Sequence, residues 1–126
     1  MRKRLGGLAI VFGFLMACIP AFAHHGVSSY DMTSVVTVKG TVTAWEFINP
    51  HVLLHFEAKD EKGNVEKWTA ETQGPNMMTR AGWNRDTLKP GDQITVIGRR
   101  AKNGSPSMRF DKVILSNGKE MLPYPY

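Results

Sequence analysis

The segment from Trp45 to Phe56 constrains the fold more than any other stretch, because two strand-like runs meet within it at Asn49-Pro50. A proline has no N–H to donate to a sheet ladder, and the residue before a proline favours extended or turn conformations. The flanking runs, residues 42–48 and 52–56, are rich in β-branched, aromatic and other apolar side chains. We therefore predict two strands joined by a hairpin or sharp bend with residues 49–51 at its corner.

Alternation along the second run separates a core face from an outer face. Successive side chains of a strand point to opposite sides of the sheet, so every second residue shares a face. The core face is predicted to hold Val52, Leu54, Phe56 and Ala58. The outer face then carries His51 and His55, which four residues of strand separate by roughly 13 Å. That is too far for one metal ion to bind both, unless a bulge intervenes or His51 belongs to the turn.

The remaining pattern predicts an all-β domain with one short helix. The first strand, over residues 35–48, places Val36, Val38, Val42 and Ala44 on one face, with Gly40 marking a bend or bulge. Further elements are predicted as strands over residues 51–58, 65–72, 93–99 and 108–115, the last kinked at Asp111-Lys112, and a helix over 76–81. Three strands, a helix and two strands is the order of the OB-fold, a five-stranded Greek-key barrel. An open β-sandwich of similar strand count is the alternative.

Residues 1–23 have the organisation of a signal peptide. A basic start, Arg2-Lys3-Arg4, precedes an apolar run too short for a comfortable membrane span, and Ala21-Phe22-Ala23 fits the small-x-small rule for cleavage. We therefore expect a periplasmic or secreted protein with an N-terminal arm (24–34), a barrel domain (35–118) and a C-terminal tail (119–126). In the alternative, residues 15–18 form a lipoprotein box and a lipidated Cys18 tethers the chain to the membrane.

Composition limits the classes of partner. The chain has 16 Lys and Arg against 11 Asp and Glu, and removing Arg2, Lys3 and Arg4 with the signal lowers the net charge from +5 to +2. That charge is weak support for nucleic-acid binding, and an exported protein rarely meets nucleic acid. Cleavage also removes Cys18, the single cysteine, so the mature domain is expected to fold without a disulfide.

The four histidines form two pairs, and this clustering is the strongest chemical signal. Cleavage after Ala23 makes His24 the first residue, whose amino group and ring nitrogen together chelate a metal ion. His25 offers a related chelate, and His51 or His55 supplies another nitrogen if the arm folds back. Nitrogen ligands suit Cu(II), so copper is the ion that this set favours. The competing interpretation is a His-His start left by the cleavage site, with His51 hydrogen-bonded in its turn and His55 on a solvated strand.

No sequence motif for catalysis is present, and a non-enzymatic binding module is the favoured interpretation. The chain lacks a Gly-x-Ser-x-Gly elbow, a Cys-x-x-Cys pair and a Gly-rich phosphate loop. A hydrolase using Glu71 with His51 is a weaker alternative. A protein-interaction or envelope-associated module is the main alternative, with Trp45, Arg99 and Arg100 as its binding surface; Trp68 is expected in the core.

Several short motifs resemble a known family. They are Ala23-His24-His25, Lys39-Gly40-Thr41-Val42, Asn49-Pro50-His51, Trp68 with Glu71, Gly82-Trp83 and Leu88-Lys89-Pro90-Gly91-Asp92. Together they resemble a bacterial exported family, domain of unknown function family 6152, over most of the mature chain. Asn-Pro-His is the most specific of these motifs, and Gly26 departs from the small polar residue expected there. The resemblance implies a small exported domain and no established activity.

Overall fold

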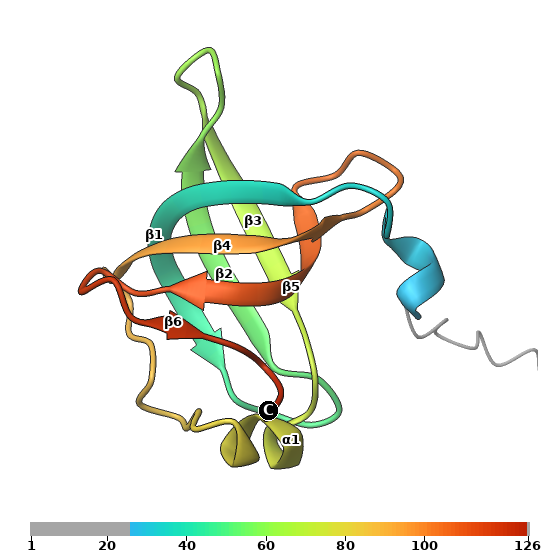
Figure 1. Ribbon diagram of the computed structural model, residues 1–126. Coiled ribbons are helices and arrows are strands. Elements are labelled where there is room, and N and C mark those ends of the chain that lie inside the picture. Colours follow the sequence, from blue (N-terminus) through green and yellow to red (C-terminus); the bar gives the residue numbers. More distant parts are fainter. Residues whose placement is uncertain (1–25, 126) are drawn as a thin grey trace, which may run out of the picture.

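The computed structural model describes residues 26–125, which form one curled six-stranded sheet with a short helix at one end (Figure 1). A 3-10 turn, η1 (Val27–Ser29), lies in the N-terminal arm, and the helix is α1 (Pro75–Arg80). The strands are β1 (Val36–Glu46), β2 (Leu53–Lys59), β3 (Val65–Glu71), β4 (Gln93–Arg100), β5 (Ser107–Ile114) and β6 (Glu120–Met121). Each predicted strand and the predicted helix is therefore present, and no end differs from its prediction by more than two residues.

The strand pairing closes the sheet into a barrel. Strands β1, β2 and β3 form an antiparallel meander, and β4 pairs antiparallel with both β1 and β5. A parallel pairing of β3 with β5 joins the two edges. With α1 placed between β3 and β4, this is the connectivity of the OB-fold. The closing β3–β5 pair excludes the open sandwich.

Strand β1 pairs with strands of both halves of the barrel and bends between the two pairings. Its first half pairs with β4 and its second half with β2. A side chain at Gly40 would collide with the Glu57 carbonyl and the Phe56 ring, so glycine permits the close crossing where the strand changes partner. The prediction of a bend at Gly40 is confirmed.

A bulge between Val42 and Ala44 changes which side chains of β1 face inward. Ala44 is opposite His55 on the outer face, whereas Trp45 is opposite the buried Leu54. The prediction that Ala44 shares the core face with Val42 is therefore wrong, because the extra residue breaks the alternation. A second irregularity leaves Asp111 without an opposite residue in the β4–β5 pairing and confirms the predicted kink in β5.

The helix closes one end of the barrel with apolar side chains. Met78 on α1 is fully buried, and Trp83, just beyond the helix, is 1% exposed. The Trp83 indole N–H donates a 2.6 Å hydrogen bond to the Leu122 carbonyl, which ties the C-terminal segment to this end. The predicted inward faces of β2 and β3 are also buried, comprising Val52, Leu54, Phe56, Ala58, Trp68 and Ala70.

The two ends of the described chain both belong to the barrel. Residues expected to form a C-terminal tail include β6, which pairs with β5, and Met121 and Pro123 are buried. At the other end, Tyr30 forms a β-bridge with Ala101 and is 6% exposed. The signal peptide, His24 and His25 lie outside the described residues. Over residues 26–125, no helix has the length and apolar character needed to cross a membrane.

Candidate functional site

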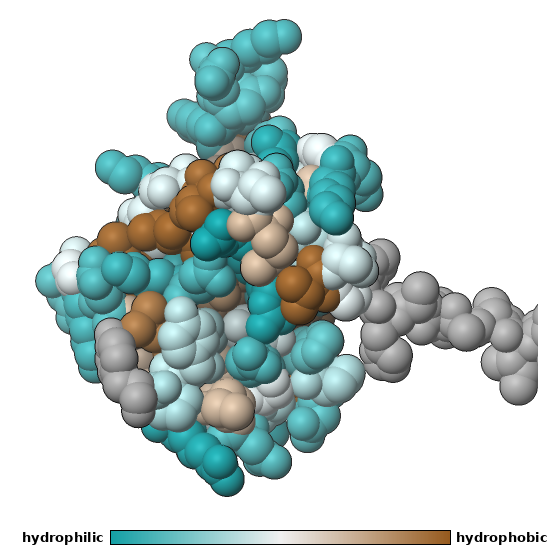
Figure 2. Space-filling model, turned by 45° about the vertical axis from the view of Figure 1, so that its right-hand side comes forward, coloured by the Kyte–Doolittle hydropathy of each residue, from teal (hydrophilic) through white to brown (hydrophobic). Residues whose placement is uncertain are grey.

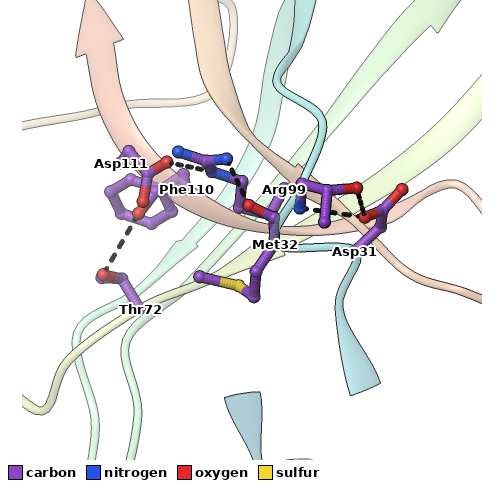
Figure 3. A network of polar contacts seen from close by, with 7 residues as sticks. Asp31, Met32, Thr72, Arg99, Phe110 and Asp111 are labelled. Atoms are coloured by element: carbon purple, nitrogen blue, oxygen red, sulfur yellow. Dashed lines mark hydrogen bonds and ion pairs between the residues drawn. The ribbon is translucent and has the colours of Figure 1, made fainter. Parts of the chain in front are cut away.

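The candidate site lies where the N-terminal arm meets the loop between β4 and β5, residues 101–106. The amide of Asp31 donates to the Arg100 carbonyl at 2.9 Å, and the amide of Lys102 donates to the Ser29 carbonyl at 3.0 Å. The Arg99 guanidinium bridges the Met32 carbonyl at 2.8 Å and the Asp111 carboxylate at 3.0 Å (Figure 3). These contacts hold the arm against the barrel although they join residues far apart in the chain.

Tyr30 places the arm beside the outer face of β3. Its hydroxyl donates a hydrogen bond to Glu71. Burial of the ring, followed by the bond to Glu71 and the negative charge of that carboxylate, raises the pKa of Tyr30 well above its usual value of 10.0, and Arg109 partly opposes the shift. The hydroxyl therefore stays protonated as a donor to Glu71 at physiological pH.

Glu71 joins Tyr30 to His51. The Glu71 Oε2 atom lies 4.0 Å from His51 Nδ1, and the Glu71 side chain is 17% exposed against 39% for His51. His51 precedes β2 in the turn that contains Asn49 and the cis-bonded Pro50. We call Tyr30, Glu71 and His51 the Glu71 cluster. It combines a carboxylate, an imidazole and a phenol from the arm, β3 and the β1–β2 turn.

A second polar group surrounds His55 on β2. Its Nδ1 atom lies 3.2 Å from the Thr69 hydroxyl, and its Nε2 atom lies 3.2 Å from Glu46 Oε1. The contact with Glu46 is close enough for a charge interaction, but its angles are not those of a hydrogen bond, and Nε2 has no other partner. We call Glu46, His55 and Thr69 the His55 cluster.

The structure thus separates the two described histidines that the sequence proposes as metal ligands. His51 contacts Glu71, whereas His55 contacts Glu46 and Thr69. Among residues 26–125, no three His, Cys, Asp or Glu side chains gather closely enough to hold a metal ion. A complete metal site would therefore need ligands from His24 or His25.

The other proposed binding residues take part in internal contacts. Trp45 donates its indole N–H to the Asn84 carbonyl at 3.0 Å and packs 5.5 Å from the Trp83 ring. The Arg100 guanidinium donates to the Ser105 and Gly104 carbonyls and stacks 5.0 Å from the Trp68 ring. Arg99 contacts the arm as described above. Trp45 lies near the end of β1 that pairs with β2, whereas the two arginines lie at the end of β4 beside the start of β1.

Three features of this region were not predicted from the sequence. They are the docked position of Tyr30, the proximity of Arg109 to it, and a pocket of about 300 Å³ between the arm, β3 and the 101–106 loop. Tyr30 is the one aromatic residue in a small, polar arm, and that contrast is the signal that would have identified it as an anchor. The pocket depends on contacts between distant segments, for which no local pattern exists.

The surface on this side is mostly hydrophilic. Figure 2, which brings the arm side of Figure 1 forward, shows hydrophobic side chains gathered in a few small patches among polar ones. The tip of the β2–β3 hairpin projects from the barrel and is hydrophilic throughout (Figures 1 and 2). On this face, specific polar contacts are therefore better suited to recognition than a broad apolar patch.

Comparison with known proteins places the chain in a family without assigning an activity. The Family of unknown function (DUF6152) matches residues 13–109. The chain belongs to DUF6152. No curated protein matches this DUF6152 chain. Its fold is similar to that in the crystal structure of a small single-stranded DNA-binding protein from Streptomyces coelicolor. The two sequences are 14% identical and the TM-score is 0.43, with 68% of this chain and 94% of the other covered.

Proposed function

We propose that this DUF6152 protein is an exported, non-enzymatic binding module that takes up a copper-class metal ion with its N-terminal histidines and His51. The observation that carries the proposal is that Glu71 contacts both Tyr30 of the arm and His51 of the β1–β2 turn. Tyr30, in the described part of the arm, is thereby held near the turn that presents the His51 imidazole.

Chain length is compatible with this arrangement. His24 and His25 precede Tyr30 by six and five residues, which span at most roughly 20 Å when fully extended. Tyr30 and His51 are each within reach of a single Glu71 side chain. A short tether keeps the effective concentration of the arm histidines near His51 high, which strengthens binding without any further contact.

The proposed ligands have the chemistry that copper prefers. The amino group and ring nitrogen of His24 would form one chelate, His25 is a further nitrogen ligand, and His51 adds another imidazole. The Glu71 carboxylate lies on the Nδ1 side of His51, so Nε2 is the nitrogen that would take the ion. A carboxylate beside a ligating imidazole orients the ring and raises its basicity.

The composition of the outer face supports a ligand other than nucleic acid. Single-stranded nucleic acids are bound by exposed aromatic side chains and basic grooves. The outward residues of β2 and β3 comprise Leu53, His55, Glu57, Lys59, Val65, Lys67, Thr69 and Glu71, in which two lysines are balanced by two glutamates and no large aromatic side chain occurs. An envelope protein as partner is the alternative, and it has less support because Trp45, Arg99 and Arg100 are engaged in internal contacts.

The test is titration with Cu(II) of the protein that starts at His24, against a form with one extra residue before His24. The extra residue removes the chelating amine from His24, so we expect at least tenfold weaker binding. His51→Ala is expected to weaken binding similarly, and His55→Ala serves as the matched control with little change. Equal affinity of the extended and authentic forms would overturn the proposal.

Mass spectrometry of protein secreted to the periplasm tests the export step on which this chemistry depends. The proposal expects a mature chain that begins with His24. A chain that retains residues 1–23, or one acylated at Cys18, would contradict it. Purification from the periplasm with a stoichiometric protein partner and without metal would favour the interaction module instead.

A further inference from the structure

We propose that the pocket between the arm, β3 and the 101–106 loop binds a small neutral polyhydroxylated molecule, such as a sugar ring or a polyol. The pocket has a volume of about 300 Å³, at the lower end of the range for small-molecule sites. Its lining residues are Ser29, Tyr30, Thr69, Glu71, Ala101, Asn103, Ser105 and Ser107. The pocket contains no histidine, and its ligand is distinct from the metal ion proposed above.

Hydroxyl groups dominate the lining. Five of the eight residues carry one, and each hydroxyl both donates and accepts, which is the hydrogen-bonding capacity of a polyol. Ser105 and Ser107 already lie 2.9 Å apart, oxygen to oxygen, so a ligand hydroxyl meets two preorganised partners. The Asn103 side-chain oxygen accepts from the Ser105 amide at 3.0 Å, which fixes the carboxamide beside them.

The charge of the pocket lining favours a neutral ligand over an ionic one. Glu71 is the single charged lining residue, and it opposes entry of phosphate or carboxylate groups. Its carboxylate already accepts the Tyr30 hydroxyl, and Arg109 is its opposite residue in the β3–β5 pairing, so a cationic ligand would have to compete with groups of the protein itself. A neutral molecule with several hydroxyls satisfies the site with the least loss of existing contacts.

The arm and the loop form the walls, so the pocket exists only when the arm is docked. Ser29 and Tyr30 come from the arm, and backbone hydrogen bonds from Asp31 and Lys102 hold that arm to the 101–106 region. The Tyr30 ring is 6% exposed, so recognition depends on hydrogen bonds more than on stacking against an aromatic face. We therefore expect a ligand bound in this pocket to retard release of the arm.

The test is an NMR titration of the uniformly ¹⁵N-labelled mature protein with glucose, in buffer that contains a chelator. We expect saturable shifts of the Thr69, Ser105 and Ser107 amides. The double variant Ser105→Ala/Ser107→Ala is expected to weaken binding at least fivefold, and Ser116→Ala, an exposed serine in the β5–β6 turn, is the matched control. The amide spectrum of each variant reports whether it is folded.

Separate titrations with ethylammonium and inorganic phosphate decide the ligand class. The proposal expects glucose to bind more tightly than either ion. Tighter binding of ethylammonium or phosphate, unchanged affinity in the double serine variant, or no saturable shift with glucose would overturn it. Because all titrations exclude free metal, their outcome is independent of whether the copper proposal succeeds.

Discussion

The two ends of the barrel are closed by different chemistry. The α1 end is filled by apolar side chains, chiefly Met78 and Trp83, while the arm end depends on hydrogen bonds and a cation–π contact made by Arg99 and Arg100. Figure 1 shows α1 and the C-terminal segment at one end, and the arm beside the 101–106 loop toward the other. The same barrel thus has one end closed by apolar packing and another held mainly by polar contacts.

The energetic difference follows from the two kinds of contact. Complete burial of a large apolar side chain contributes about 1.5–3 kcal/mol, and truncating one costs more because a cavity remains. An intramolecular hydrogen bond contributes only about 0.5–1.5 kcal/mol net, since water is a competing partner. We therefore expect substitutions at the α1 end to affect global stability most, and substitutions at the arm end to affect local opening.

The strongest test of this contrast compares two adjacent methionines on α1. Met78 is fully buried and Met77 is 39% exposed. Met78→Ala should lower the free energy of unfolding by about 2–5 kcal/mol because it leaves a cavity in the core, whereas Met77→Ala should change it by less than about 0.5 kcal/mol. Chemical denaturation measures both, and similar losses at the two positions would remove the proposed role of Met78.

Tyr30→Phe tests the anchor of the arm. Loss of the hydroxyl should cost about 1–2 kcal/mol near neutral pH, because the bond goes to a charged acceptor in a buried position. The raised pKa means that the folded protein holds this proton more tightly than the unfolded chain. The associated stability is present below about pH 10 and falls as the pH rises beyond it.

Urea denaturation of the wild-type protein and of Tyr30→Phe between pH 8 and pH 11 tests whether this stability falls as the pH rises. The wild-type protein should lose more stability than Tyr30→Phe above pH 10, so that the two curves converge. A constant difference across the range would show that Tyr30 does not titrate as its contacts imply. Thr69→Val, which keeps Tyr30 and removes a neighbouring hydroxyl, should retain the wild-type pH dependence.

Arg100→Ala tests the contacts that hold the 101–106 loop at the arm end of the barrel. The change removes two hydrogen bonds to loop carbonyls and the stacking on Trp68, and should cost about 1 kcal/mol. Hydrogen exchange at the amides of residues 101–107 should accelerate more than exchange in β2. Lys102→Ala, an exposed neighbour, is the control and should leave both measurements unchanged.

The smallest effect is expected at Asp31. Hydrogen bonds from the Thr33 side chain and amide and from the Ser34 hydroxyl lower the pKa of Asp31 below its usual value of 3.8. The contribution of this turn is therefore present above pH 3.8 and is lost as the pH falls through the lower folded value. NMR titration of the carboxylate should show this midpoint, and Thr33→Val should raise it; an unchanged midpoint would contradict the assignment.

Sequence patterns predicted the parts of the fold that depend on local preference. Alternation identified the buried faces of β2 and β3, and the corner at Asn49-Pro50 and the helix before Gly82 followed from their turn residues. The strand order then matched one known barrel topology. These features depend on neighbours within a few residues, which is why a single sequence sufficed.

The features that were missed depend on distant contacts or on one extra residue. Strand β6 has only two residues, and its pairing with β5 gives no periodic signal. Tyr30 gains its role from Glu71, far along the chain, so the arm appeared to be free. Of the candidate site, the sequence paired His51 with Glu71 only in the hydrolase alternative, and gave no sign that Tyr30 lies beside them.

The bulge in β1 has a consequence for how the protein tolerates changes in length. Thr43 has no opposite residue on β2, because Val42 is opposite Phe56 and Ala44 is opposite His55. A deletion of Thr43 would therefore remove the bulge and still leave Trp45 opposite Leu54, with its indole directed inward. A deletion of Lys39, which is opposite Thr95 on β4, would instead invert the side-chain frame of one flank of β1 and turn Val36 and Val38 to the outer face.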